Sequence, residues 1–244
     1  MKKTLLLAAA MLSLVAGSAM AAGLDLSWDD CLATTAGGLN KTSLCTSNSG
    51  SSNCYGTYVL ANNTPSNVVA NDMVMDINTN GSTLPCWWNF TAAPRTTGIS
   101  VAFITPCASN ATDYWGSVTG GPFGGFAAQL YPSVPQRVRI VMTVAIDGNA
   151  PEAAPVPGGQ ETYSYTFTLK NTNSVGTCTG CLTSACLVLN RINVDLSANP
   201  PIELTSQDAR NFVFWQGGAI NAPGCPLAVP TTNKTWGSVK ALYR

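Results

Sequence analysis

Histidine is absent from this 244-residue sequence, and charged residues make up only 10% of it, against about 25% in an average soluble domain. Without histidine there is no Ser-His-Asp triad, no Cys-His dyad and no histidine-ligated metal site. The 12 basic residues are matched by 12 acidic ones, so no positive excess attracts nucleic acid. Hydrophobic residues reach 45%, which excludes a disordered chain. The composition therefore predicts a folded protein with no nucleic-acid partner.

Long apolar runs are also missing beyond the N-terminus. There, two lysines precede an apolar stretch over residues 4–15, and small residues follow at Ala19 and Ala21. This order is typical of a secretory signal peptide cleaved before Ala22. The stretch is shorter than the ~20 residues of a spanning helix. We expect residues 1–21 to be removed, leaving a secreted or cell-envelope protein without a membrane span.

Cysteine is the reactive residue type that the chain does contain. An exported chain reaches an oxidising compartment, where thiols pair. Because nine is odd, at most four disulfides form within one chain and one cysteine is left over. The spacing favours a Cys31–Cys45 disulfide and a pair within the group 178–186. The candidates are Cys31, Cys45, Cys54, Cys86, Cys107, Cys178, Cys181, Cys186 and Cys225.

The run Cys178-Thr-Gly-Cys181 has the CxxC spacing of redox and zinc sites. A zinc site in this chain would need further cysteine ligands, because histidine is absent. A thioredoxin-like site needs a βαβ context, whereas the flanking residues indicate a strand, a glycine-rich loop and another strand. We therefore expect the cysteines of this motif to form structural disulfides, and we expect no metal and no cofactor.

Alternating apolar and polar residues predict β-strands along the whole mature chain. The clearest segments are Gln136–Asp147 and Glu161–Lys170, in which every second side chain is apolar. This period of two places alternate side chains on opposite faces of a strand. Further strands are expected at residues 24–28, 56–61, 72–78, 99–103, 191–196 and 212–216.

About eight strands, separated by clusters of Gly, Pro, Asn and Ser, indicate an all-β fold. One-sided alternation is typical of antiparallel sheets that bury one face. We predict an antiparallel β-sandwich of the Greek-key, jelly-roll, immunoglobulin or cohesin-like kind, with long loops fastened by disulfides. A closed barrel is the alternative. Residues 22–244 are expected to form one domain, ending in a helical or extended tail at 235–244.

Five motifs carry a resemblance to a known group: LDLSWDDC (24–31), LPCWWNF (84–90), CTGCLTSAC (178–186), NFVFWQGG (211–218) and TWGSVKALYR (235–244). Together they resemble a group of uncharacterised exported bacterial proteins with the same spaced tryptophans and cysteines. Because that group has no assigned activity, the resemblance implies none for this chain. The pattern of ETYSYTFTLKN and CLVLNRINVDL is also similar to cohesin-like and carbohydrate-binding sandwich modules. This second resemblance implies architecture alone, because a fold does not deliver a function.

Aromatic residues are the candidates for ligand binding. Neighbours in a strand point to opposite faces, so one ring of Trp87-Trp88 is expected to face away from the core. An exposed tryptophan there would stack on a sugar or anchor a partner, whereas the alternative has it covered by a loop. Residues 107–135 form a glycine-rich loop that either binds or folds on its own small core. The named candidates are Trp87, Trp88, Tyr114, Trp115 and Trp215.

Carboxylates supply no clear catalytic pair. Asp29, Asp30, Asp72 and Asp76 are the acidic candidates, but no set of nucleophile, base and orienting residue is visible. We therefore predict an exported non-enzymatic module with a structural, adhesion or surface-interaction role. The alternative is a carbohydrate-binding module, and a carboxylate- or metal-dependent hydrolase is less favoured. The expected partner is a glycan or another cell-surface protein.

Overall fold

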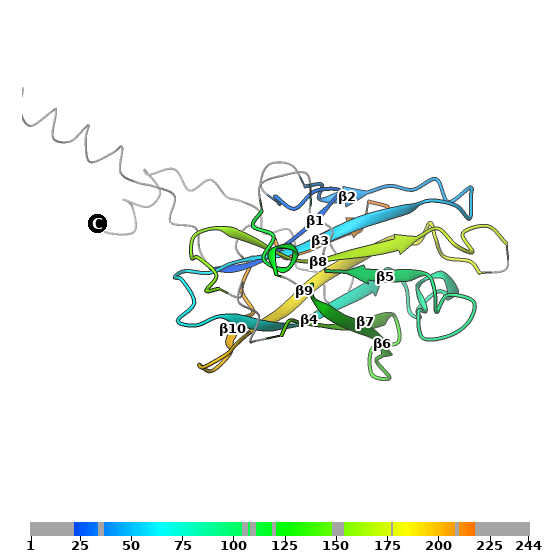
Figure 1. Ribbon diagram of the computed structural model, residues 1–244. Helices are drawn as coiled ribbons and strands as arrows, with labels where there is room; N and C mark the ends of the chain where they lie inside the picture. The colour runs from blue at the N-terminus through cyan, green and yellow to red at the C-terminus, as the bar shows by residue number, and fades with distance from the viewer. Residues whose placement is uncertain are drawn as a thin grey trace, which may run out of the picture.

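A computed structural model describes residues 22–217, except 34–36, 104–106, 108–110, 119–120, 148–153, 177 and 208–209. Two β-sheets pack face to face (Figure 1). The first has the strand order β1-β3-β8-β5, formed by β1 (Gly23–Trp28), β3 (Ser51–Val59), β8 (Glu161–Lys170) and β5 (Ile99–Ala102).

The second sheet has the order β2-β11-β9-β4-β7-β6, with β10 also paired to β9. Its strands are β2 (Asn40–Lys41), β11 (Phe212–Trp215), β9 (Ala185–Leu196), β4 (Val68–Thr79), β7 (Arg137–Ala145), β6 (Phe123–Leu130) and β10 (Ile202–Leu204). Two short 3-10 helices, η1 (Cys86–Trp88) and η2 (Trp115–Ser117), lie in the connections. Apart from the parallel pair β11–β2, all pairings between these strands are antiparallel. The predicted all-β sandwich is confirmed.

The core lies between the two sheets, where the alternating apolar side chains meet. In β7, Val138, Ile140, Met142 and Val144 are fully buried, as their alternation predicts. Removing such side chains from water stabilises a fold by about 1.5–3 kcal/mol each. One continuous cluster of buried residues joins both sheets, so the alternation seen in the sequence is sufficient to define the core face.

The sandwich is joined along one margin and open along the other. The amide of Leu24 donates to Ser206 O (2.8 Å) and that of Leu26 to Arg210 O (2.7 Å), which ties β1 to the segment between β10 and β11. At the opposite margin, β5 and β6 end their sheets, and the described residues place no strand beyond either. The chain is therefore a sandwich closed on one side, and not a closed barrel.

A β-bulge changes the predicted facing of β8. Gly56 pairs with Tyr165, but Thr57 pairs with Tyr163, so Ser164 is the extra residue. Ser164 consequently reaches across the core to the Met73 sulfur (3.0 Å). Tyr163 is fully buried in the core cluster, as predicted, and its hydroxyl shares a hydrogen bond with Thr166 (2.8 Å). A bulge inserts one residue into the pleat, and simple alternation did not reveal it.

The prediction of a long structureless loop over residues 107–135 is wrong in its second half. Residues Phe123–Leu130 form β6, which pairs with β7 along its whole length. Its sequence, FGGFAAQL, contains two glycines and no polar alternation, so the period-two signal was missing. Phe103 packs so closely on Gly124 that a side chain there would lie 2.6 Å from its ring. The Thr143 carbonyl oxygen would lie still closer, so this position of β6 has no room for a side chain.

Some predictions fall on parts of the chain outside the described residues. These are the signal peptide at 1–21, the tail at 235–244 and Cys225. Among the described residues, no helix is both long and apolar enough to cross a membrane.

Candidate functional site

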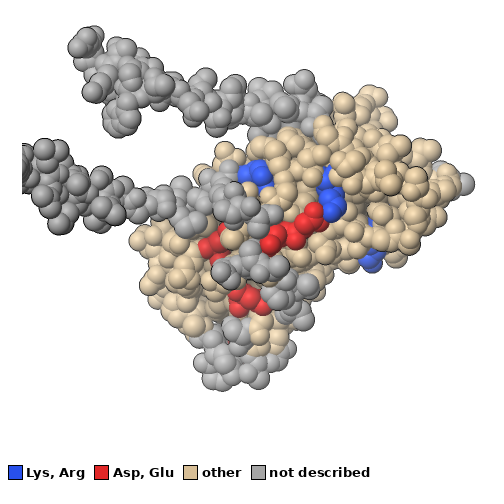
Figure 2. Space-filling view, turned by 90° about the horizontal axis from the view of Figure 1, so that it is seen from above, with Lys and Arg blue, Asp and Glu red and all other residues tan. Residues whose placement is uncertain are grey.

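The four aspartates considered for catalysis hold structural contacts. Asp29 binds Lys41 Nζ at 2.7 Å, and Asp30 Oδ1 accepts the amide of Cys31 at 2.7 Å. Asp72 accepts the Thr143 hydroxyl at 2.6 Å, while Asp76 is buried beside arginines. Charged side chains are scattered on the face seen in Figure 2, and most of its described surface is uncharged.

One acidic group lies next to cysteine sulfur. Ligand atoms of Asp30, Cys31 and Cys107 all lie within 4.8 Å of one another. However, Cys31 and Cys107 are joined in a disulfide. A metal-binding cysteine acts as a thiolate, so these sulfurs are not metal ligands in this state.

Between described residues, three disulfides join segments that are distant in sequence: Cys31–Cys107, Cys45–Cys181 and Cys86–Cys178. Such disulfides are typical of an oxidising compartment. The predicted Cys31–Cys45 pair is wrong, because the fold brings each of these cysteines to a partner far along the chain. The prediction of a pair within residues 178–186 is also wrong. Cys178 and Cys181 bind other segments, and Cys186 is disulfide-bonded as well.

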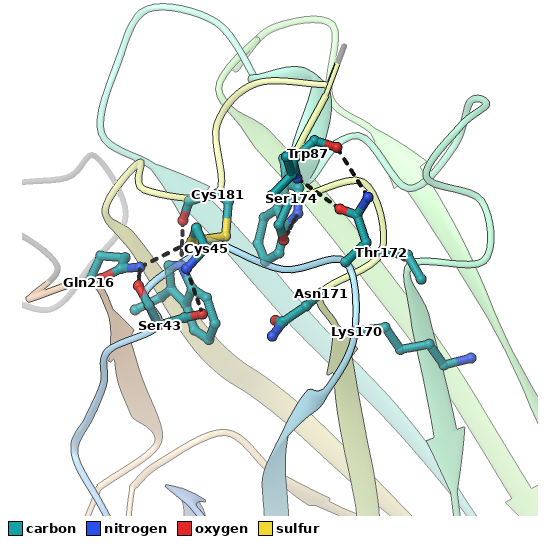
Figure 3. Close-up of a disulfide and its surroundings, with 12 residues drawn as sticks. Ser43, Cys45, Trp87, Lys170, Asn171, Thr172, Ser174, Cys181 and Gln216 are labelled. Atoms are coloured by element: carbon teal, nitrogen blue, oxygen red, sulfur yellow. Dashed lines mark hydrogen bonds between the residues drawn. A yellow bond between two sulfur atoms is a disulfide. The ribbon is translucent and has the colours of Figure 1, made fainter.

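The CTGC motif therefore fastens two different segments to one loop. Around the Cys45–Cys181 disulfide, Gln216 Nε2 lies 3.5 Å from Cys45 Sγ and also donates to Ser43 O (Figure 3). The Thr179 carbonyl, inside the motif, accepts the amide of Trp87 at 3.0 Å. The structural interpretation of this motif is supported by these contacts, since both of its sulfurs are oxidised in separate disulfides.

Cys54 is the free cysteine of the described residues, and it is fully buried in β3. Burial raises the pKa of the Cys54 thiol well above its ordinary value, with a smaller opposing effect from Arg210. A thiol in its neutral form is a poor nucleophile and a poor metal ligand. No local sequence signal distinguishes this cysteine from the other eight, because its isolation depends on tertiary packing.

Four tryptophans form the tryptophan cluster: Trp28, Trp87, Trp88 and Trp215, all fully buried. Ring centroids lie 4.9 Å apart for Trp87 and Trp88, and 5.6 Å apart for Trp87 and Trp215. Three of the indoles donate hydrogen bonds: Trp28 to Phe214 O, Trp87 to Ser174 Oγ and Trp215 to Cys181 O. Aromatic pairs at such distances stabilise a core beyond their buried area.

These positions correct the expectation that Trp87 or Trp88 faces away from the core. Both lie on η1, a 3-10 helix, so the opposite-face rule for neighbours in a strand does not apply. Trp115 is also fully buried, and Tyr114 donates from its hydroxyl to Val68 O at 2.7 Å. With Trp215 buried as well, none of the five predicted binding residues offers an exposed ring. The glycan hypothesis loses the residues on which it depended.

A buried arginine supports the tryptophan cluster. Arg95 lies over the Trp87 ring, 4.3 Å from its centroid. Its Nε donates to Trp87 O at 2.8 Å, and Nη1 donates to the carbonyls of Lys170 and Thr172. Burial lowers the pKa of Arg95 to about 10, which leaves the guanidinium charged at neutral pH. Arg95 thus binds three loop carbonyls, and its role is structural.

Exposed apolar side chains gather instead on β6. Phe123 is 66% exposed, Leu130 49% and Phe126 39%. Among the described residues β6 pairs only with β7, so its other edge is unpaired. The seven-stranded sheet is wider than the four-stranded one, so the four-stranded sheet covers β6 only in part. Figure 1 shows β6 at the margin of the lower layer.

An open cleft of about 380 Å³ lies where β6 turns into β7. Leu84, Leu130 and Tyr131 line it with two prolines, and Arg137 adds a guanidinium. Arg139 lies 4.6 Å from the centroid of the Tyr131 ring. A hydrogen bond to Asp76 raises the pKa of Arg139. No sequence motif marks this cleft, because its lining comes from segments about 50 residues apart in the chain.

Comparisons with known proteins provide no identification. No protein-family model matches the chain, and no curated protein matches it. One solved structure that is similar over 80% of this chain and 83% of its own is described as AvmM, which catalyzes macrocyclization in alchivemycin A biosynthesis. The two share 11% sequence identity with a TM-score of 0.36. These values are too low to transfer fold or activity to this chain.

Proposed function

We propose that the chain is an exported, non-enzymatic structural module that associates with a second copy of itself through the free edge of β6. The exposed apolar edge of β6 carries this proposal. Natural proteins protect edge strands with charges, prolines or bulges. The sequence of β6, FGGFAAQL, has neither charge nor proline, and its pairing with β7 is regular. Such an edge is suited to accepting another strand.

A second copy fits this edge because two uncharged strands pair without charge mismatch. Pairing about a two-fold axis makes one interface from identical surfaces, the commonest arrangement in soluble oligomers. Without Lys2 and Lys3 of residues 1–21, 10 basic residues remain against 12 acidic ones, a net charge of −2 (10 − 12), and low net charge favours association. Antiparallel pairing of two β6 strands would join the seven-stranded sheets of the two copies into one continuous sheet. The signal-peptide pattern predicted for residues 1–21 and the disulfides support placing this assembly outside the cytoplasm.

Sedimentation velocity over a range of protein concentrations tests the proposal. The wild-type chain is expected to form a dimer, and Ala127→Lys is expected to remain a monomer. Ala127 is exposed on β6 opposite Val141, so a lysine there needs no space in the core and adds the protective charge that the edge lacks. Ala127→Ser, the matched control, should still form the dimer.

Two outcomes would contradict the proposal. The first is a wild-type chain that stays monomeric at every concentration. The second is an Ala127→Lys variant that associates as strongly as the wild type.

A further inference from the structure

The cleft at the β6–β7 turn has the size of a ligand site. Its volume of about 380 Å³ lies within the range of small-molecule pockets, roughly 300–1,000 Å³. One wall comes from residues on either side of η1, Leu84 before it and Asn89 after it, and the other is the turn around Tyr131. The two walls are tied together, since the amide of Leu84 donates to Pro135 O at 2.8 Å.

The turn itself is held by its own backbone. The amide of Val134 donates to Tyr131 O at 3.1 Å, and that of Arg137 donates to Val134 O at 3.0 Å. A wall fixed by such bonds loses little conformational entropy when a ligand binds. The lining is largely apolar, contributed by Leu84, Leu130 and Tyr131 together with Pro132 and Pro135.

Charge at one side of the cleft is positive. Arg137 is held by Asn78, which accepts from Nε at 2.7 Å, and by Asp76, 3.6 Å from Nη1. Arg139 forms a two-point contact with the same Asp76 at 2.7 and 2.9 Å. Both guanidiniums lie against the Tyr131 ring. One carboxylate thus serves two arginines, which leaves one positive charge in excess.

We propose that this cleft binds a small apolar anion. The apolar body of the ligand lies between Leu84, Leu130 and the Tyr131 ring, and its carboxylate or sulfonate lies on the Arg137 guanidinium. An arginine oriented by its neighbours is well suited to bind such an oxyanion. This site is separate from the β6 edge that we propose for self-association, although Leu130 belongs to the same strand.

Two dyes with the same rings test the proposal: 1-anilinonaphthalene-8-sulfonate and its neutral counterpart N-phenyl-1-naphthylamine. Fluorescence titration of the purified protein should give saturable binding of the sulfonate, with a Kd about tenfold lower than that of the neutral dye, the change that one charge-assisted contact supplies. Arg137→Gln should remove this difference while leaving the neutral dye unaffected. Arg137→Lys should restore part of it.

Further variants separate the cleft from other apolar surface. Leu130→Asp should abolish binding of both dyes. Leu182→Ser, which removes a leucine that is 67% exposed elsewhere, should change neither. Ala127→Lys should also bind the sulfonate normally, so a failure of self-association is distinguishable from a failure of the cleft.

The proposal is overturned if the sulfonate shows no saturable binding, or if the neutral dye binds as tightly. It is equally overturned if Arg137→Gln leaves the sulfonate Kd unchanged. Near-ultraviolet circular dichroism of each variant confirms that its core is intact.

Discussion

The two margins of the seven-stranded sheet contrast in how they are covered. At the closed margin, β11 is flanked by β2 and β9 and lies against the tryptophan cluster, and Phe214 and Trp215 are buried. At the open margin, β6 has one neighbour and leaves Phe123 largely exposed. Both strands are rich in aromatic residues, with three in β11 and two in β6, so aromatic content alone does not decide whether a strand is buried. The width of the opposing sheet and the loops fastened over it decide that.

The two margins also differ in what they offer: the closed margin stabilises the fold, and the open margin presents surface for interaction. Near the closed margin, disulfides, Arg95 and indole hydrogen bonds fix loops over the core. The open margin has exposed apolar side chains and the neighbouring cleft. Regions with few buried contacts contribute little to global stability and are free to serve binding. The following predictions test this separation, from the largest expected effect to the smallest.

Removing a disulfide at the closed margin should have the largest effect. The double variant Cys86→Ser/Cys178→Ser opens a link across a sequence separation of 92. Removing the cross-link from a loop of that length costs about 4.6 kcal/mol of stability in the chain-entropy account. Urea unfolding, followed by tryptophan fluorescence, measures the loss. The control Leu182→Ser, an exposed leucine close to Cys181, should stay within about 0.5 kcal/mol of the wild type. A loss below about 1 kcal/mol in the double variant would mean that the loop is held by packing alone.

The buried thiol of Cys54 should make stability depend on alkaline pH. Cys54 pairs with Trp28 across β1 and β3, and desolvation raises its pKa well above the ordinary value. In the unfolded chain the thiol ionises near pH 8.5, while the folded chain keeps its proton. The unfolded state then binds fewer protons, so the contribution of Cys54 is complete below pH 8.5 and is lost as the pH rises.

The expected decline is about 1 kcal/mol between pH 8.5 and 9.5, and it approaches about 1.4 kcal/mol per pH unit at higher pH. Urea unfolding between pH 8.5 and 9.5, below the ordinary tyrosine pKa of about 10, limits the contribution of buried tyrosines, whose pKa burial also raises, and comparison with Cys54→Ala subtracts it. Cys54→Ala should unfold with a flatter pH dependence than the wild type. An equal pH dependence of the free energy of unfolding in the two proteins would show that water reaches the Cys54 thiol in the folded chain.

The smallest expected change in the free energy of unfolding is at Phe123, and Phe214 provides the matched comparison. Phe123→Ser on β6 should change the free energy of unfolding by less than about 0.5 kcal/mol, because the ring is largely solvent-exposed already. Phe214→Ser on β11 should cost about 3 kcal/mol, since that ring is buried beside Phe212. Thermal and urea unfolding of both variants measure the difference. Similar losses at the two positions would remove the contrast between the margins.

Several features of this protein were predictable from local sequence. Strict alternation placed β7 at Arg137–Ala145 and β8 at Glu161–Lys170 within one or two residues. Prediction failed where the period was interrupted, as at β6 with its two glycines and at the bulge beside Ser164. The short strands β2 and β10 were also missed, because two or three residues carry no measurable period. Local alternation therefore predicts which face of a strand is buried, and it does not predict bulges or short strands.

The candidate site was not predictable in the same way. Trp87 and Trp88 were expected to divide between core and solvent, but a 3-10 helix under the Cys86–Cys178 disulfide buries both. The sequence determined the β class, the buried face of regular strands such as β7 and the presence of one cysteine in excess. Only the tertiary structure decided which cysteines pair, which aromatic rings reach water and where Arg137 meets Leu84, because each depends on contacts between segments far apart in the chain.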